Sequence, residues 1–209
     1  MVMCTGCLFI ITAPSGTGKT SLVSALLGND PGLRLSVSYT SRPPREGEVD
    51  GRDYYFVSRE QFEKMQVSGD FLESAEVYGN WYGTSQYWIS ETMQSGQDIV
   101  LEIDCQGAAQ VRKFFPQSIG IFVLPPSASA LEERLRARNK DTADVIRRRL
   151  KAVREEVSHI NEFDYVIINR ILDDAIHDLA CIVRAERLKR ERQLQMQKNQ
   201  VLVSQLASF

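Results

Sequence analysis

Residues 8–20 read LFIITAPSGTGKT, and this stretch decides the fold class of the 209-residue chain. Its five apolar and β-branched first residues predict a buried strand. Apolar residues at helical spacing over residues 22–27 predict a helix, which the sequence NDPG at residues 29–32 ends. Residues 13–20 fit the pattern Ala/Gly-x-x-x-x-Gly-Lys-Ser/Thr. Strand, glycine-containing loop and helix in this order are typical of a P-loop, which binds a nucleoside triphosphate.

The chemistry of the loop explains each of its residue types. Small residues let backbone N–H groups point inward as a nest for anions, and the helix adds the positive end of its dipole. We expect Lys19 to reach the β- and γ-phosphates and the Thr20 hydroxyl to ligate Mg²⁺. A tight turn before an ordinary helix is the rival interpretation. The expected ATP-binding residues are Ala13, Pro14, Ser15, Gly16, Thr17, Gly18, Lys19 and Thr20.

The alternation of strand and helix signals continues along the chain. Apolar strands are predicted at residues 98–104, 119–124 and 165–168, and a long helix begins near Asp173. Such alternation favours an α/β fold with a parallel sheet.

Two regions depart from this alternation. Residues 36–96 are rich in Ser, Gly, Tyr and Trp and contain short strand-like pieces, of which residues 71–77 are the longest, so we interpret them as an inserted β-rich subdomain. Residues 127–157 form two arginine-rich helical stretches around a polar break at residues 139–142. Residues 186–209 are polar and then apolar, and the pattern leaves open a helical extension or a loose tail.

The composition excludes several classes of protein. A hydrophobic fraction of 43%, a charged fraction of 25% and a net charge of -2 exclude a disordered chain and give no basic field for nucleic acid. The longest apolar runs are far shorter than the roughly 20 residues of a membrane span, and the first basic residue is Lys19, which predicts no signal peptide. We therefore expect a cytoplasmic protein without a membrane or nucleic-acid partner. Cys4-x-x-Cys7 matches half of a metal pattern, but two buried thiols beside a strand are the simpler interpretation.

A second anion site is indicated downstream of the loop. Residues 33–40 alternate between apolar and polar side chains, which predicts one strand with Ser38 on its polar face. Arg42-Pro-Pro-Arg45 follows. A polyproline II conformation would place the two guanidinium groups on one edge, roughly 9 Å apart, where they could converge on one anion. Two solvated loop arginines are the alternative.

Candidate base-binding and metal-binding groups lie further along the chain. Glu73, Tyr82 and Thr84 belong to a stretch rich in aromatic residues that suits a pocket for a planar base, although such residues also form cores. Glu102 and Asp104 share a face at the carboxyl end of a predicted strand, where α/β proteins bind ligands. A structural ion pair is the rival interpretation of these two carboxylates.

Helix geometry selects candidates among the arginines of residues 127–157. Arg149 falls inside the apolar stripe of its helix, so it needs a buried or bound anion. Arg134 and Arg138 are i,i+4 neighbours that can act together, with a solvated surface as the alternative. Residues 134–154 carry nine Lys and Arg against two Asp, a local charge of +7.

Together these motifs resemble the guanylate kinases, P-loop kinases that transfer a phosphoryl group from ATP to GMP. The resemblance runs from about residue 8 to about residue 185. It rests on APSGTGKT, SVSYTSRPPREGEVDGRDYYF, FLESAEVYGNWYGTS, VLEIDCQG, PPS and VIIN, in this order, of which the second is specific to the family. Ala13 in place of the first loop glycine, Thr84 in place of a common serine and Arg138-Asn139-Lys140 in place of Arg-Gly are departures from the pattern.

The resemblance implies a three-layer P-loop fold over residues 6–185. Its parallel-sheet core would span residues 6–35, 97–126 and 158–185, with a GMP-binding insert at about 36–96 and an arginine-rich lid at about 127–157.

The resemblance also implies roles for individual residues. Arg42, Arg45, Tyr54 and Tyr82 would hold the GMP phosphate. Ser38, Glu73, Thr84 and Asp104 would read guanine, and Asp104 is a further candidate for contact with Mg²⁺ through water. Catalytic roles fall to Lys19, Arg42, Arg134, Arg138 and Arg149.

The expected reaction is reversible transfer of the γ-phosphoryl group of ATP to GMP and dGMP. The sequence leaves open whether the protein is a monomer or a homo-oligomer. The alternatives are a kinase for another nucleoside monophosphate and a non-enzymatic guanylate kinase-like binding module. Such modules have degraded P-loops, whereas Gly16, Gly18, Lys19 and Thr20 are all present here.

Overall fold

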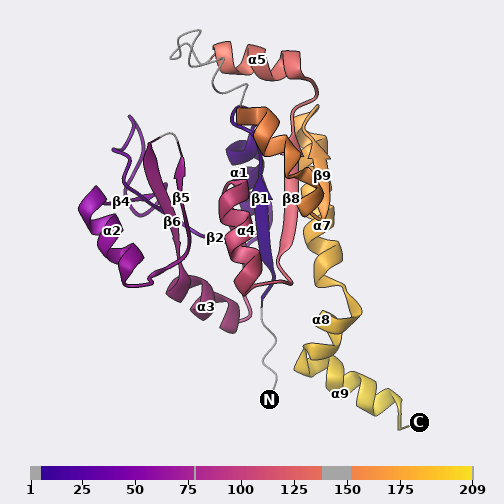
Figure 1. Cartoon of the computed structure of the whole chain (residues 1–209). Coiled ribbons are helices and arrows are strands. Elements are labelled where there is room, and N and C mark those ends of the chain that lie inside the picture. Colours follow the sequence, from indigo (N-terminus) through magenta and orange to yellow (C-terminus); the bar gives the residue numbers. More distant parts are fainter. Residues whose placement is uncertain (1–5, 78, 138–151, 209) are drawn as a thin grey trace.

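The computed structural model describes residues 6–77, 79–137 and 152–208. Figure 1 shows a central sheet with helices on both faces, a smaller sheet beside it, a helix above one end of the central sheet, and two helices that lead away to the C-terminus.

The central sheet has five parallel strands in the order β2-β7-β1-β8-β9. These are β1 (Leu8–Thr12), β2 (Leu33–Leu35), β7 (Asp98–Glu102), β8 (Ile119–Leu124) and β9 (Tyr165–Ile168). All five residues of β1 are buried, because helices cover both faces of a parallel sheet. The predicted α/β fold with a parallel sheet is confirmed.

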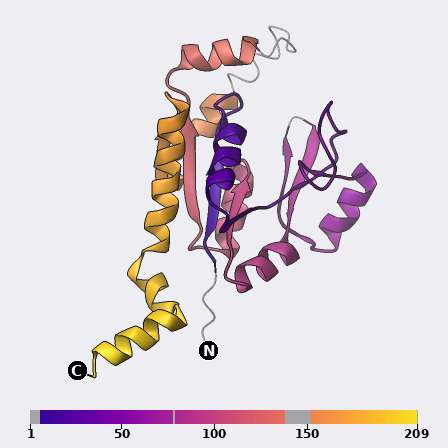
Figure 2. The same cartoon turned by 180° about the vertical axis from the view of Figure 1, so that it is seen from behind.

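Helices form the two outer layers. On one face, α1 (Lys19–Asn29) and α7 (Leu172–Arg187) pack on Phe9 and Ile11, and Figure 2 shows these helices from behind. On the other face, α4 (Cys105–Phe114) and α3 (Gln86–Gln94) pack on Leu8 and Ile10. Alternate side chains of β1 therefore enter opposite cores, and the loop that follows β1 emerges from the middle of the sheet.

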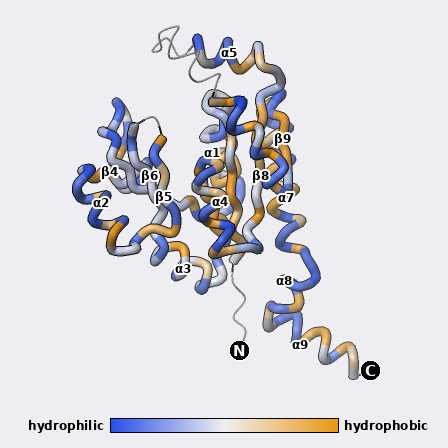
Figure 3. Tube along the Cα trace, in the orientation of Figure 1, coloured by the Kyte–Doolittle hydropathy of each residue, from blue (hydrophilic) through white to orange (hydrophobic). Residues whose placement is uncertain are grey.

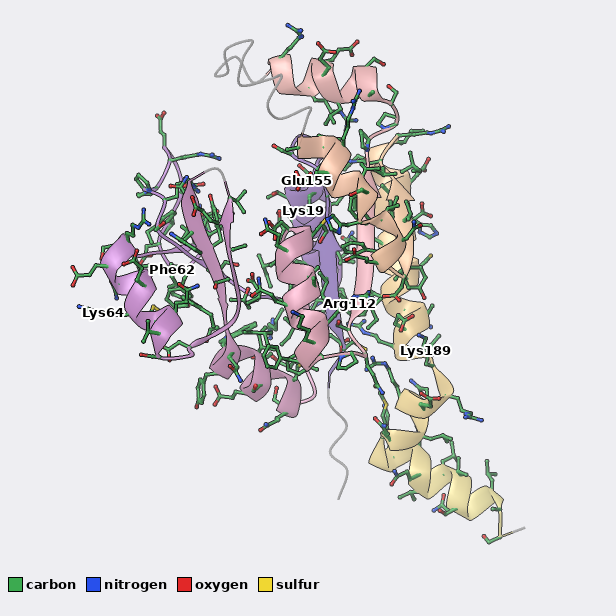
Figure 4. All side chains as sticks on the ribbon, viewed as in Figure 1. Lys19, Phe62, Lys64, Arg112, Glu155 and Lys189 are labelled. Atoms are coloured by element: carbon green, nitrogen blue, oxygen red, sulfur yellow. The ribbon has the colours of Figure 1, made fainter. Side chains whose placement is uncertain are left out.

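The smaller sheet has the order β4-β3-β6-β5. Its strands are β3 (Tyr39–Thr40), β4 (Tyr55–Phe56), β5 (Phe71–Val77) and β6 (Asn80–Ser85). Helix α2 (Arg59–Val67) covers it, and Phe62, which is fully buried, stacks on Phe71 between helix and sheet (Figure 4). Neither α2 nor α3 is predicted by the sequence patterns. Each of these helices buries a single side chain, Phe62 or Ile89, and so shows no helical apolar stripe.

The prediction of one strand over residues 33–40 is wrong. Residues 33–35 pair with β7, and the Ser36 backbone N–H donates to the Val100 carbonyl at 3.0 Å. Residues 39–40 instead pair with β4 and β6 in the smaller sheet. The chain therefore crosses between sheets at residues 36–38. Alternation reports which face a side chain takes, and it does not report which sheet a strand joins.

The remaining elements lie at the two ends of the molecule. Helix α5 (Ala128–Ala137) confirms the first predicted arginine-rich helical stretch, whereas residues 138–151 lie outside the described part of the chain. Residues 152–158 are helical and precede η1 (Ile160–Glu162). The C-terminal segment forms two separate helices, α8 (Arg190–Gln195) and α9 (Gln197–Leu206).

The distribution of hydropathy follows this architecture. Figure 3 shows apolar residues concentrated on the central strands and mixed along the C-terminal helices. Among the described residues, no helix combines the length and the hydropathy needed to cross a membrane.

Candidate active site

A cavity of about 320 Å³ lies between the P-loop, the smaller sheet and the carboxyl end of β7. All eight residues of the P-loop line it. Five of the residues predicted to bind GMP also line it, namely Ser38, Tyr54, Glu73, Tyr82 and Asp104. The fold thus brings the predicted triphosphate loop and most of the predicted acceptor residues to one cavity.

The P-loop presents a free helix N-terminus to this cavity. Gly18 is the N-cap of α1, has a φ of 93°, and provides no side-chain cap, so the first backbone N–H groups of the helix remain available to an anion. The Lys19 ammonium group lines the cavity and donates to the Ile103 carbonyl at 3.4 Å. This arrangement is suited to binding a triphosphate.

Asn169, which follows β9, binds the P-loop at the Thr17 carbonyl. Its Nδ2 atom donates to the Thr17 carbonyl at 2.7 Å, and a Cβ atom at Gly18 would lie 2.8 Å from the same nitrogen. Arg134 of α5 donates to the same carbonyl at 3.2 Å. Asn169 has no role among the predicted site residues, although its place directly after a predicted strand at the ligand-binding edge was a usable signal.

Thr20 and Glu102 form the best-suited pair for a magnesium ion. The Thr20 hydroxyl donates to Glu102 Oε1 at 2.7 Å, and hydroxyl and carboxylate oxygens are ligands that Mg²⁺ accepts. Asp104 Oδ1 accepts from the Gly107 N–H at 2.9 Å and so caps α4. Within the described residues, no three His, Cys, Asp or Glu side chains gather into a metal site. The donor set therefore fits an ion that takes its other ligands from phosphates and water.

The two cysteines of the half metal pattern are described in part. Cys7 is buried beside β1, and this burial raises its pKa to about 12. Cys4 lies outside the described residues. The Cys7 thiol is therefore held in its neutral form beside the strand.

Glu73 is a buried carboxylate on β5. Burial raises its pKa to about 7, and the nearby charge of Asp104 acts in the same direction. The Thr84 hydroxyl donates to Glu73 Oε1 at 2.6 Å and opposes this shift. Thr84 is fully buried and does not line the cavity, so the structure places its hydroxyl on Glu73. Its direct contact with guanine stays a prediction.

The two arginines of the predicted anion site differ in their surroundings. Arg42 is 9% exposed, and its Nη2 atom donates to Glu48 Oε1 at 2.8 Å. The Tyr54 ring centroid lies 5.4 Å from Arg42 Cζ. Arg45 is exposed, and its backbone N–H donates to Glu48 Oε2 at 2.7 Å. Neither arginine lines the cavity. Glu48 belongs to the family-specific motif but has no predicted role, and its carboxylate accepts from the Arg42 guanidinium group and from the backbone N–H of Arg45.

Comparison with known proteins identifies the family. The family model described as guanylate kinase matches residues 6–186. The chain belongs to the guanylate kinase family. It is similar to the guanylate kinase of Nitrosospira multiformis, at 61% identity over 189 residues that cover 90% of each chain, and to that of Nitrosomonas europaea, at 57% identity over 92% and 96% of the chains. The crystal structure of guanylate kinase from Anaplasma phagocytophilum superposes with a TM-score of 0.78 at 32% identity, with 95% of each chain covered.

The three arginines of the predicted lid are described in part. Arg134 contacts the P-loop carbonyl of Thr17, whereas Arg138 and Arg149 lie outside the described residues. Glu156, which no motif indicated, lines the cavity, and burial raises its pKa to about 7 while the charge of Lys19 acts against that rise. Among the described residues that line the cavity, Lys19 thus lies beside the carboxylates of Glu102, Asp104 and Glu156.

Proposed function

We propose that the chain transfers the γ-phosphoryl group of ATP to GMP, and also to dGMP, to give ADP and GDP or dGDP. One observation carries this proposal. A single cavity is lined by the whole P-loop on one side and by Ser38, Glu73 and Tyr82 on the other. Donor and acceptor can therefore meet with the reacting groups held in place. The reaction serves the recycling of GMP and the supply of guanine triphosphates, and its cytoplasmic location remains a prediction from composition.

On the donor side, backbone N–H groups of the P-loop and Lys19 bind the phosphates of ATP. Thr20 would hold Mg²⁺, with Glu102 and Asp104 as further oxygen ligands, directly or through water. When bound, the ion neutralises charge on the β- and γ-phosphates. Arg134, together with Arg138 and Arg149, stabilises the charge that spreads over the transferring group.

On the acceptor side, the ionised Glu73 accepts hydrogen bonds from guanine N1–H and the 2-amino group. Adenine has no N1–H, so AMP would leave the buried carboxylate unpaired. Ser38, Thr84 and Asp104 complete the base site. Arg42, Arg45, Tyr54 and Tyr82 bind the phosphate of GMP, which replaces Glu48 as the partner of Arg42.

The transfer is direct and in line, without a covalent intermediate. The acceptor is a phosphate oxyanion, so no side chain has to remove a proton, and the site acts by positioning and charge stabilisation. His159 and His177 take no part, since neither of them lines the cavity.

The proposal is tested by measuring ADP formation with GMP, dGMP, AMP and UMP as acceptors for MgATP. We expect GMP and dGMP to be phosphorylated far faster than AMP or UMP. Lys19→Met should lower turnover by about a hundredfold or more while far-UV circular dichroism is unchanged. Faster turnover of AMP or UMP than of GMP would show that the chain is a kinase for another nucleoside monophosphate. Binding of GMP without turnover would favour a non-enzymatic binding module.

A further inference from the structure

Helix α4 approaches Glu73 unusually closely at Gly107. A Cβ atom at position 107 would lie 2.7 Å from Glu73 Oε2 and 3.2 Å from its Cδ atom, closer than side chains pack. Gly107 is the third residue of α4 and does not have a positive φ, so the backbone alone does not require glycine there. Alanine would favour the helix more. The missing side chain therefore provides space for the carboxylate.

Glu73 cannot easily yield this space, because its surroundings hold it on several sides. Glu73 is 4% exposed, and its other oxygen accepts from the Thr84 hydroxyl at 2.6 Å. The next residue of β5, Ser74, is bound to α4 by both atoms of the Gln110 amide. The Ser74 N–H donates to Gln110 Oε1 at 3.2 Å, and Gln110 Nε2 donates to the Ser74 carbonyl at 2.9 Å. The distance between helix and strand is thus fixed next to the carboxylate.

We propose that Gly107 is a specificity-determining residue for the acceptor base. Asp104, Gly107 and Gln110 follow one another at intervals of three, so they share one face of α4. Asp104 lines the cavity, Gly107 admits the Glu73 carboxylate, and Gln110 holds its strand. These three residues of α4 therefore fix the position at which the Glu73 carboxylate can accept hydrogen bonds from a purine with adjacent N1–H and 2-amino donors. The inference rests on the proposed function and adds a residue that touches no substrate.

The test is Gly107→Ala, measured in steady-state assays with GMP and AMP as acceptors. We expect the KM for GMP to rise by about tenfold to a hundredfold, because the reading group is displaced. The preference for GMP over AMP should fall, and the KM for ATP should stay unchanged. Wild-type values for Gly107→Ala would overturn the inference.

Gly28→Ala is the matched control for this substitution. Gly28 is likewise helical but exposed, and a Cβ atom added there would meet no atom within 4 Å. Gly28→Ala should therefore behave as wild type in both assays. A similar rise in the KM for GMP in both variants would overturn the assignment of specificity to Gly107.

A second variant separates a displaced carboxylate from general damage. Glu73→Asp shortens the side chain by one methylene and relieves the contact with a Cβ at position 107. Glu73→Asp should therefore raise the KM for GMP less in the Gly107→Ala background than in wild type, and equal effects would overturn the inference. If Gly107→Ala alone does not fold, the double variant should fold, and its failure to do so counts against the contact. If the wild-type protein has no kinase activity with GMP, both the proposed function and this inference are wrong. If the wild type is active and Gly107→Ala has the same kinetic constants, only this inference is wrong.

Discussion

At the scale of single residues, Glu73 combines a cost in stability with a role in recognition. It is buried, its only described hydrogen-bond donors come from Thr84, and no cation in the described part of the chain contributes to its pKa of about 7. An ionised carboxylate in such a place destabilises the folded protein, but it is also the group that distinguishes guanine from adenine in the proposed reaction. Recognition by this residue is therefore expected to come at the expense of stability.

This expectation can be measured with Glu73→Gln. The folded protein holds the proton of Glu73 more tightly than the unfolded chain does. The stability that this proton contributes to the fold is therefore fully present below about pH 4.5 and is lost as the pH rises through about 7. Glu73→Gln should raise the free energy of unfolding by on the order of 2 kcal/mol at pH 8 and by little at pH 5, while discrimination against AMP falls. Urea denaturation at both values of pH checks this. Glu156 shifts in the same direction and is present in both proteins, so a pH-independent difference would contradict the assignment to Glu73.

At the scale of elements, the P-loop depends on a residue that lies 152 positions from its anchor point. The Thr17 carbonyl and the Gly18 N–H belong to one peptide group and point in opposite directions. Asn169 at the end of β9 binds that carbonyl, which keeps the N–H directed towards the cavity. We expect β9 to contribute to ATP binding without contact between Asn169 and the transferring phosphoryl group.

Asn169→Asp tests this role with a side chain of nearly the same size that cannot donate. The carboxylate would face the Thr17 carbonyl, so the peptide group should lose its fixed orientation. We expect the KM for ATP to rise about tenfold, with the KM for GMP changed little. The melting temperature should fall as well, because Asn169 is buried and the new carboxylate would face a carbonyl oxygen. Equal rises in both KM values would indicate a general disturbance of the site.

The elements that could be predicted from the sequence are those whose pattern is local. The strands at residues 8–12, 119–124 and 165–168 have the limits that the sequence predicts, because each is a short apolar run between turn signals. The strand at residues 71–77 also has its predicted limits, although polar residues interrupt its apolar ones. Helices α2 and α3 were missed because each buries one side chain. The P-loop can also be predicted, because its pattern lies within eight consecutive residues. The Asn169–Thr17 and Gly107–Glu73 contacts could not be predicted, because they join residues far apart in the sequence and depend on distances that only the folded chain creates.

At the scale of the whole molecule, Arg187 near the end of α7 joins three elements. Its Nη1 atom lies 2.5 Å from Asp30 after α1, and its Nε atom lies 2.6 Å from Asp98 at the start of β7. Asp98 also accepts from the backbone N–H of Cys7. Removal of the guanidinium group would leave two carboxylates without their cation at the base of the sheet.

Arg187→Met should therefore lower the free energy of unfolding by about 2 kcal/mol. Arg59→Met is the matched control, since Arg59 forms an exposed i,i+4 pair with Glu63 and its loss should cost less than about 0.5 kcal/mol. Urea denaturation of both variants measures the difference. Equal losses would show that the position of Arg187 between three elements carries no special weight.

The crossing of the chain between the two sheets has a mechanical consequence. The polypeptide leaves the large sheet and enters the small one within residues 36–38, and Ser38 of this link lines the cavity. Ser38 is thus held between the two sheets, and the hydrogen bonds between Ser74 and Gln110 join the small sheet to α4 at a second place. Two separate attachments restrain a sheet against rotation more than one attachment does. The acceptor side of the cavity is therefore braced by the core from two directions.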